Sequence, residues 1–260
     1  MKRQTRDYYN GLVRWGKPLD EANQERVQLT VGLVPPGIST VLDLGCGDGT
    51  VSNLLVRKGL KVTGVDISPV ALKYFKGKGI IANLDQFPFL EHCFDLVICA
   101  EVLEHLLEGV YERTLKEIER VARHYVIITT PNEEYLPANF VKCENCGRIY
   151  HMNLHTRAFD RIAHRTLFQE FELVKTVEIN NWRHCSIISW FEQKFLGVYK
   201  FKEGLVCPRC GHNGVDSATL GLTKKFLLKA FRLLDRWLPQ RSKPRWIASL
   251  YRSGGREAKK

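Results

Sequence analysis

Three glycines and one aspartate stand where they can hold a nucleoside. In VLDLGCGDGT, an apolar run leads into Gly45, Gly47 and Gly49, which permit a sharp turn and let a ligand lie against bare backbone. The third glycine follows the second by two residues, whereas a dinucleotide fingerprint needs three, so the spacing argues against NAD or FAD. Asp66 ends the next apolar run, in the place from which a carboxylate accepts both ribose hydroxyls.

Four cysteines have the spacing of a metal site. They form two CxxCG units, in which a tight turn points both sulfurs at one place and the following glycine allows left-handed backbone. Four thiolates suit tetrahedral Zn²⁺ and leave no position for a water, so we expect a structural ion. Reduced core cysteines or a disulfide are the alternatives. The expected zinc ligands are Cys143, Cys146, Cys207 and Cys210.

The segment EVLEH carries a third group of polar residues. Glu101, Glu104 and His105 share one face if the segment is helical, and they could hold a divalent ion. The group resembles the metal triad of some O-methyltransferases, in which the ion polarises a hydroxyl nucleophile. The alternative is that no metal binds and His105 only helps to shape the site. Further candidate ligands or substrate contacts are His151, His155 and His164.

The elements that position these groups alternate between strand and helix. Apolar runs predict strands at 40–44, 61–65, 79–82, 94–99 and 124–130, and helical spacing predicts helices at 23–34, 50–58, 69–76, 108–122 and 222–238. A helix and a strand are expected near 159–179. Such alternation predicts a mostly parallel sheet with helices on both faces, whose ligands bind at the carboxyl ends of the strands.

Residues 39–130 resemble the class I S-adenosylmethionine-dependent methyltransferases, of types 11, 12 and 23. LDLGCGDG matches the first motif of that family, Asp66 matches its ribose-binding acid, and FDLVICAEVLEHL at 94–106 matches its fourth motif. The resemblance implies a Rossmann-like, doubly wound α/β fold with a seven-stranded sheet, and S-adenosylmethionine as the cofactor.

The resemblance also implies roles by position. Asp43, Gly45 and Gly47 would face the methionine end of the cofactor, Ile67 would flank adenine, and Ala100 and Glu101 would border the transferred methyl group. Methyl transfer chiefly requires alignment of a nucleophile behind the methyl, so a catalytic base is optional. The candidate catalytic residues are Glu101 and His105.

The predicted adenine contact departs from the family pattern. The family usually has an acidic residue five positions before the proline of its "PF" segment, and this chain has Asn83 there. The amide oxygen of Asn83 can still accept from the adenine amino group, and Asp85 can substitute for it. We therefore expect adenine to lie against residues Asn83, Leu84 and Asp85.

The basic charge of the chain is concentrated at one end. The formal net charge is +11, and residues 221–260 carry twelve Lys or Arg against two acidic residues. In LTKKFLLKAFRLLDRWL, apolar residues form one helical stripe and basic residues occupy the rest, which is typical of a helix on an anionic membrane surface. Packing of the stripe on the domain, or RNA binding, are the alternatives.

These patterns predict four parts of the chain. They are an N-terminal helical lid (1–36), a methyltransferase domain (37–142 and 155–200), a zinc-knuckle insertion (143–154 and 201–215) and a basic amphipathic tail (220–260). The sequence shows neither an export signal nor an apolar stretch of membrane-spanning length, so a cytoplasmic protein, peripheral at the inner face of the membrane, is expected.

The expected function is methyl transfer from S-adenosylmethionine, with O-methylation of a glycan or lipid-linked saccharide as the leading interpretation. The overall plan, with its zinc knuckles and its basic end PRWIASLY, resembles methyltransferases of cell-envelope polysaccharide synthesis. An RNA methyltransferase is one alternative, and a metal-dependent O-methyltransferase of a small aromatic or quinone precursor is another. A cofactor-binding scaffold without turnover is the non-enzymatic alternative.

Overall fold

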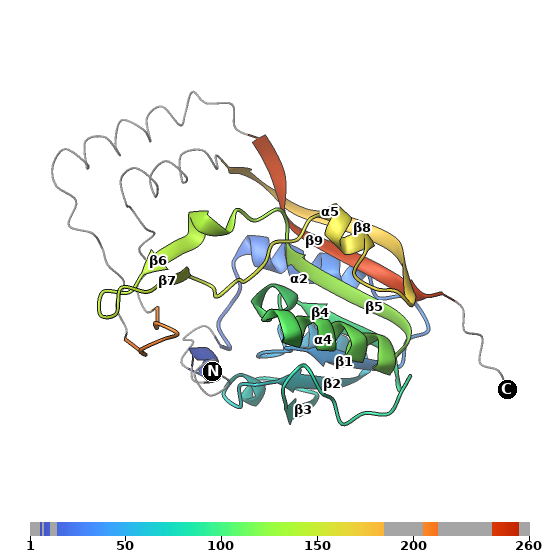
Figure 1. Ribbon diagram of the computed structural model, residues 1–260. Helices are drawn as coiled ribbons and strands as arrows, with labels where there is room; N and C mark the ends of the chain where they lie inside the picture. The colour runs from blue at the N-terminus through green and yellow to red at the C-terminus, as the bar shows by residue number, and fades with distance from the viewer. Residues whose placement is uncertain (1–5, 7, 11–14, 185–204, 213–240, 255–260) are drawn as a thin grey trace. The chain divides into compact units, whose positions relative to one another are not determined.

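The computed structural model describes residues 6, 8–10, 15–184, 205–212 and 241–254 of the chain (Figure 1). They divide into two compact units. The sheet unit comprises Tyr9–Glu133, Phe159–Asn180 and Pro244–Lys260, and the cysteine unit comprises Met1–Tyr8, Glu134–Ala158 and Asn181–Lys243.

The sheet unit is built on a seven-stranded sheet of order β3-β2-β1-β4-β5-β9-β8. Strands β1 to β5 pair in parallel, and β9 pairs with β5 in the antiparallel sense. The strands are β1 (Thr40–Leu44), β2 (Lys61–Asp66), β3 (Lys78–Ile81), β4 (Phe94–Ala100), β5 (Ala122–Pro131), β8 (Phe171–His184) and β9 (Arg241–Ser253). The order confirms the predicted Rossmann-like fold with seven strands.

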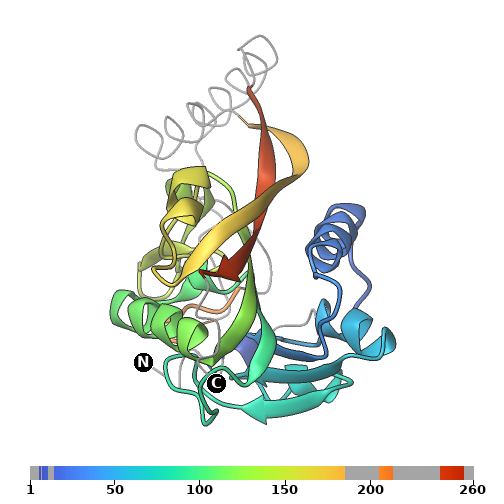
Figure 2. The same cartoon turned by 90° about the vertical axis from the view of Figure 1, so that its right-hand side faces the viewer.

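Helices lie on both faces of this sheet. Figures 1 and 2 show α2 on one side and α4 on the other. The helices of the unit are α2 (Glu21–Gly32), α3 (Ser52–Arg57), α4 (Glu108–Val121) and α5 (Arg161–Arg165), with short 3₁₀ turns η1 (Ala71–Lys73) and η2 (Leu103–His105). The helix predicted at 69–76 is therefore only a 3₁₀ turn.

The apolar side chains of the central strands alternate between two cores. In β1, Leu42 and Leu44 pack in the core that contains Ile118 of α4, while Val41 packs in the core that contains Val27 of α2. Successive side chains of a strand point to opposite faces, so a sheet that is covered on both sides reads as a continuous apolar run. This explains why the parallel strands were predictable. It also shows that α2, predicted as part of a separate lid, packs on the sheet.

The prediction of a basic tail over 220–260 was wrong for residues 241–253. These residues form β9, and its register with β5 pairs Ile247 with Thr130, Leu250 with Ile127 and Tyr251 with Val126. Ile247, Ala248 and Tyr251 are buried, because the segment WIASLY carries the apolar and aromatic residues that a covered strand requires. The predicted helix at 222–238 lies outside the described residues.

The cysteine unit holds a small hairpin and two cysteine turns. The hairpin pairs β6 (Phe140–Lys142) with β7 (Ile149–His151), after the 3₁₀ turn η3 (Leu136–Asn139). Its apolar cluster consists of Val141, Cys143, Tyr150, Leu205 and Cys207. The unit is thus wider than the predicted insertion, because it also takes in 134–142 and 155–158.

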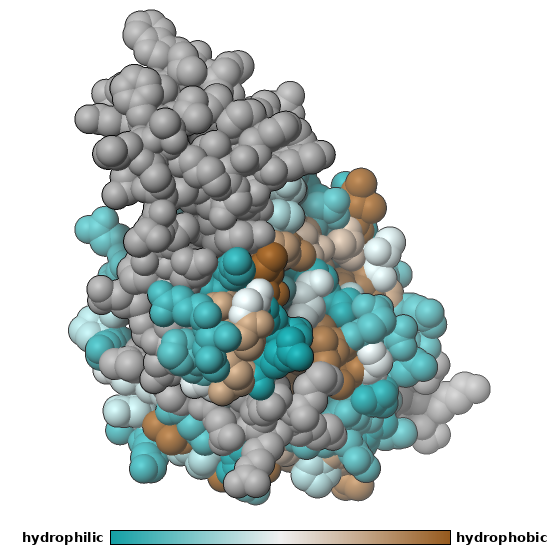
Figure 3. Space-filling view, turned by 60° about the vertical axis from the view of Figure 1, so that its left-hand side comes forward, coloured by the Kyte–Doolittle hydropathy of each residue, from teal (hydrophilic) through white to brown (hydrophobic). Residues whose placement is uncertain are grey.

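The described surface is mixed in character. On the face in Figure 3, brown hydrophobic residues form small patches that teal hydrophilic residues separate. The most exposed large apolar side chains are Leu90, at 81%, and Ile162, at 71%. No helix of the described residues is long and apolar enough to cross a membrane.

Candidate cofactor and metal sites

The glycine loop after β1 has the backbone that its sequence predicts. Gly45 and Gly47 have φ angles of +67° and +54°, a region that favours glycine. A Cβ atom on Gly45 would lie 2.4 Å from the Val102 side chain, and one on Gly47 would lie 3.0 Å from Trp15. The loop therefore requires glycine at both positions, because of its backbone angles and because side chains pack against it.

Asp66 holds this loop in place. The carboxylate is 8% exposed, and its Oδ2 atom accepts from the Gly47 amide at 2.8 Å. Its Oδ1 atom accepts from the Ser68 amide at 2.7 Å. Each carboxylate oxygen has a second lone pair, so Asp66 retains the capacity to accept a ribose hydroxyl. The sequence predicted the ligand contact, and the structure adds that the same carboxylate anchors the loop.

Asp43 lies in β1, just before the glycine loop begins at Gly45. Its side chain is 3% exposed, and Oδ2 accepts from the Ser52 hydroxyl at 2.5 Å. Burial raises the pKa of Asp43 to about 7, the Ser52 hydrogen bond opposes the rise, and the nearby Asp66 adds to it. Asp43 thus titrates near neutral pH, and a cationic ligand would favour its charged form.

The residues predicted to contact adenine follow the end of β3. Asn83 is exposed, whereas the Oδ2 atom of Asp85 accepts from the Arg113 guanidinium at 2.9 Å. The carbonyl oxygen of Leu84 accepts from the Thr114 hydroxyl at 2.7 Å. The ion pair occupies Asp85, so Asn83 is the stronger candidate of the two for the adenine amino group. Ile67, the expected flank of the adenine ring, is half-buried just after β2.

The end of β4 brings two predicted residues to the same edge of the sheet. Ala100 ends the strand, and Glu101 follows it with a φ of +59°, an unusual angle for a residue with a side chain. The Glu101 amide donates to the Thr129 carbonyl at 2.8 Å, and its Oε2 atom accepts from the Trp246 indole at 2.8 Å. The carboxyl ends of β1, β2 and β4 thus carry the predicted cofactor residues together.

The segment EVLEH is not an α-helix. Leu103–His105 form a 3₁₀ turn after the left-handed Glu101, so the three polar residues do not share a helix face. Glu104 is 1% exposed, and its Oε1 atom lies 3.9 Å from the Nε2 atom of His105. The His105 ring meets Tyr9 edge to face, with centroids 6.1 Å apart. Glu104 and His105 remain neighbours, although Glu101 is turned to Trp246.

The four predicted zinc ligands come together in the cysteine unit. Their sulfur atoms all lie within 4.8 Å of one another, with 3.6 Å between Cys143 and Cys210 and 3.6 Å between Cys146 and Cys207. Zn–S bonds of about 2.3 Å in a tetrahedron separate sulfurs by about 3.8 Å, whereas a disulfide bond is about 2.0 Å long. The arrangement fits a zinc ion and does not fit a disulfide.

The two cysteine turns are built alike. The Gly147 amide donates to the Cys143 carbonyl at 3.0 Å, and the Gly211 amide donates to the Cys207 carbonyl at 2.9 Å. Both glycines have positive φ angles, +66° and +73°. The sequence CxxCG thus dictates one local shape twice, and residues from distant parts of the chain complete a single set of thiols.

A second polar cluster in the cysteine unit was only partly predicted. His151 and His155 were candidates, and the structure joins both to Glu134, which the sequence did not single out. Glu134 Oε1 is 3.2 Å from His151 Nε2 and accepts from Asn139 at 2.7 Å, and Oε2 is hydrogen-bonded to His155 Nδ1. Burial acts to raise the pKa of Glu134, but the two histidine hydrogen bonds outweigh it and hold the pKa well below its usual range.

Backbone donors fix the tautomer of His151. Its Nδ1 atom accepts from the amides of Asn153 and His155, each at 3.2 Å. The neutral ring then carries its hydrogen on Nε2, which donates to Glu134 and has no lone pair for a metal. The cluster therefore reads as a hydrogen-bonded network that orders the segment after the hairpin.

His164, another candidate from the sequence, belongs to the core of the sheet unit. It is fully buried, with Nε2 at 3.0 Å from the Thr130 hydroxyl and Nδ1 at 2.9 Å from the Ser249 hydroxyl. Burial lowers its pKa to about 4, so the ring is neutral and serves the packing of β5 against β9.

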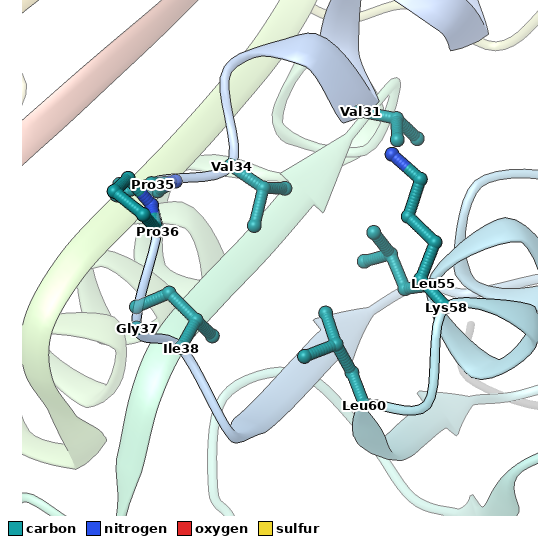
Figure 4. Close-up of a pocket in the computed structure, with 9 residues that line it drawn as sticks. All are labelled: Val31, Val34, Pro35, Pro36, Gly37, Ile38, Leu55, Lys58 and Leu60. Atoms are coloured by element: carbon teal, nitrogen blue, oxygen red, sulfur yellow. The ribbon is translucent and has the colours of Figure 1, made fainter.

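The pocket in Figure 4 is separate from these sites. It has a volume of about 260 Å³ and is lined by Val31, Val34, Pro35, Pro36, Gly37, Ile38, Leu55, Lys58 and Leu60. Gly37 and Ile38 lead into β1, so the pocket lies at the amino end of that strand. The glycine loop lies at the other end, where α/β sheets bind their ligands.

Known proteins are similar to part of this chain. Residues 42–128 match the methyltransferase domain family. An uncharacterised protein of Methanocaldococcus jannaschii is 37% identical over 126 residues, which cover 46% of this chain and 52% of that protein. A ubiquinone biosynthesis O-methyltransferase of Paracidovorax citrulli is 34% identical over 101 residues, which cover 35% and 42%. The chain thus spans about half the length of these curated relatives, or less.

A solved structure extends the likeness of fold. A SAM-dependent methyltransferase from Archaeoglobus fulgidus superposes with a TM-score of 0.56 at 18% identity, over 90% of this chain and 94% of that one. The domain match, the sheet order and the glycine loop clamped by Asp66 agree. Together they support the match of residues 42–128 to the methyltransferase domain family and the Rossmann-like fold of that domain.

Proposed function

We propose that the protein transfers the methyl group of S-adenosylmethionine to a hydroxyl oxygen. The observation that carries this proposal is the placement of Glu101 at the carboxyl end of β4. The glycine loop and Asp66 lie at the carboxyl ends of the neighbouring parallel strands β1 and β2, at the same edge of the sheet. A carboxylate there can orient an acceptor hydroxyl and take its proton. Relatives that match 35% of this chain carry the name ubiquinone biosynthesis O-methyltransferase, which supports oxygen as the acceptor atom.

S-adenosylmethionine supplies an electrophilic methyl on a sulfonium, which is already a good leaving group. Asp43, with Gly45 and Gly47, would hold its methionine end, and Asp66 would hold the ribose. Ala100 would border the methyl, and Glu101 or His105 would accept the hydroxyl proton as the new O–C bond forms and the S–C bond breaks. Alignment of the acceptor is thus the main task of the chain's own residues.

Two acceptor classes have specific support. A small phenol or quinone precursor is favoured by the names of the curated relatives, and the oxygen and nitrogen ligands of Glu104 and His105 would allow a divalent ion to assist. A glycan or lipid-linked saccharide at a membrane surface is favoured by the basic, amphipathic sequence of residues 222–238. The ubiquinone biosynthesis O-methyltransferases match only 35% of this chain, so their names alone do not decide between the two classes.

A screen for methyl transfer separates these classes. Purified protein, labelled S-adenosylmethionine and pools of phenols, saccharides, membrane lipid extract and RNA would be incubated with and without a chelator. We expect label in a hydroxyl-bearing pool, and loss of label with Glu101→Ala. Loss of methyl transfer with the chelator and with Glu104→Ala would favour metal-assisted methylation of a phenol. Cofactor binding without transfer to any pool would overturn the proposal in favour of a binding scaffold.

We further propose that the four cysteines hold a structural zinc ion. The sulfur separations and the matching turns support this. Four thiolates would fill the tetrahedral ligand positions and leave none for a substrate. The ion would pin the loops at 143–147 and 207–211, which are about sixty residues apart in the sequence.

A further inference from the structure

Trp246 contacts the carboxylate at the candidate methyl site from a strand that the cofactor motifs do not include. Its indole nitrogen lies 2.8 Å from Oε2 of Glu101, although the two residues are 145 positions apart in the sequence. An indole N–H is a donor only, so this contact favours the ionised form of Glu101 and fixes the direction of one carboxylate oxygen.

The indole itself is firmly held. Trp246 is 4% exposed, and β9 places it opposite Pro131, the last residue of β5. The Arg245 guanidinium carbon lies 4.2 Å from the ring centroid, and that of Arg26 lies 5.6 Å away. Cations over an indole are attracted to its face and withdraw electron density, which strengthens the N–H as a donor.

The backbone of Glu101 needs such support. Its left-handed φ of +59° is costly for a residue with a Cβ atom and persists only where surrounding contacts determine it. Two contacts do so: the Glu101 amide donates to Thr129 of β5, and the side chain accepts from Trp246 of β9. Adjacent strands thus hold the backbone and the side chain of one residue.

From this geometry we infer that Trp246 is a positioning residue, which aims the Glu101 carboxylate at the acceptor hydroxyl. This inference rests on the proposed function. It gives β9 a role in the reaction in addition to its role in the sheet. Because Trp246 acts through Glu101, which would border the methyl group and not the ribose, its loss should spare the binding of S-adenosylmethionine.

The test compares Trp246→Phe with Tyr251→Phe. The first removes the donor to Glu101 and keeps an aromatic ring, and the second removes another buried donor of β9, the Tyr251 hydroxyl that bonds to the His164 carbonyl at 2.7 Å. We expect Trp246→Phe to lower kcat by about tenfold, the scale of a hydrogen bond to a charged group, with unchanged cofactor affinity. Tyr251→Phe should lower Tm and leave kcat unchanged.

The pH profile gives a readout that a merely structural role would not move. Loss of a donor raises the pKa of a carboxylate, so the acid limb of the kcat profile of Trp246→Phe should shift upward by about one pH unit. In a Glu101→Ala background, Trp246→Phe should cause no further loss. Additive losses, or an unmoved acid limb, would overturn the inference.

Nuclear magnetic resonance tests the contact without activity. The indole N–H signal that vanishes in Trp246→Phe should titrate with pH in the wild type and stop titrating in Glu101→Gln. A signal that titrates equally in Glu101→Gln would refute the contact. A wild-type protein that binds the cofactor but methylates nothing would instead refute the proposed function, and the two failures are distinct.

Discussion

The sheet unit and the cysteine unit are each stabilised internally, and in different ways. Among the described residues, the sheet unit has two apolar cores of nineteen and seventeen buried residues, whereas the cluster of the cysteine unit has five, and two of these are zinc-ligand candidates. Apolar burial stabilises in proportion to area, so the larger cores can support a sheet without help. We therefore expect the described part of the cysteine unit to depend on its thiols and polar contacts, and its stability to respond to changes that leave the sheet unit intact.

The largest effect should come from removal of the metal. Cys143→Ser, or a strong chelator, should abolish zinc content and unfold the β6–β7 hairpin, because structural zinc contributes on the order of 10 kcal/mol to small sites. Hydrogen exchange should show lost protection at residues 140–151 and retained protection in β1 and β4. Cys93→Ser, which changes a half-buried thiol of the sheet unit, is the matched control. Equal zinc content in both variants would contradict the site.

A smaller effect is expected from a change of Asp66, whose carboxylate holds the glycine loop of the sheet unit. Asp66→Asn replaces a carboxylate that accepts from two backbone amides, so we expect the Kd for S-adenosylmethionine to rise about 100-fold, near 3 kcal/mol. Calorimetry measures this directly. Asp85→Asn, in a carboxylate paired with Arg113, should weaken binding far less. The assignment of the ribose site fails if the Asp85 variant loses more affinity.

The Glu134 network should matter less than the zinc, though in the same unit. Glu134→Gln replaces a carboxylate, which faces three donors, with an amide whose NH₂ group cannot accept a hydrogen bond. We expect this change to lower the free energy of unfolding by about 2 kcal/mol. Since the folded pKa of Glu134 is depressed, its stabilising contribution is complete above the unfolded pKa and is lost as pH falls through the folded value.

Denaturant unfolding at pH 7 and at pH 3 would test this sign. The difference between wild type and variant should shrink at the lower pH. Glu144→Gln, in the same unit but half-exposed and 3.9 Å from His212, should have no measurable effect. Equal losses in both variants would show that the buried network contributes nothing special.

The smallest effect concerns the pH dependence of cofactor binding. With a pKa of about 7, Asp43 becomes mostly ionised between pH 6 and pH 8, and the affinity for the cationic cofactor should rise roughly tenfold over this range. The stability of the free protein should change in the opposite direction: the folded pKa is raised, so stability falls as pH rises through it. Asp43→Asn should remove both trends, and a slope that survives this change would exclude Asp43 as the cause.

The sequence predicted most of the sheet unit because its signals are local. The strands from β1 to β5 are runs of apolar residues, and the glycine spacing before Asp66 specifies a loop that the structure reproduces. The CxxCG repeats are equally local. The residues by which the cofactor site was predicted lie in strands β1 to β5 or in the loops that follow them.

What the sequence did not reveal depends on contacts between distant residues. Strand β9 carries Arg245 and Arg252 beside its apolar residues, so its basic charge masked a strand that forms only by pairing with β5. The contacts of Trp246 with Glu101 and of Glu134 with His151 also join residues that are apart in the sequence, and no spacing of residue types predicts them. The left-handed Glu101, which ends the helical reading of EVLEH, is likewise fixed by neighbouring strands.

The late position of β9 has a consequence for synthesis of the chain. Strand β5 ends at Pro131, but its partner begins only at Arg241, so about 110 residues, most of the cysteine unit among them, emerge from the ribosome before the pair can form. Until then the side of β5 away from β4 is an open strand edge, which invites pairing with other chains. A nascent chain arrested before residue 241 should therefore depend on chaperones far more than the finished protein does.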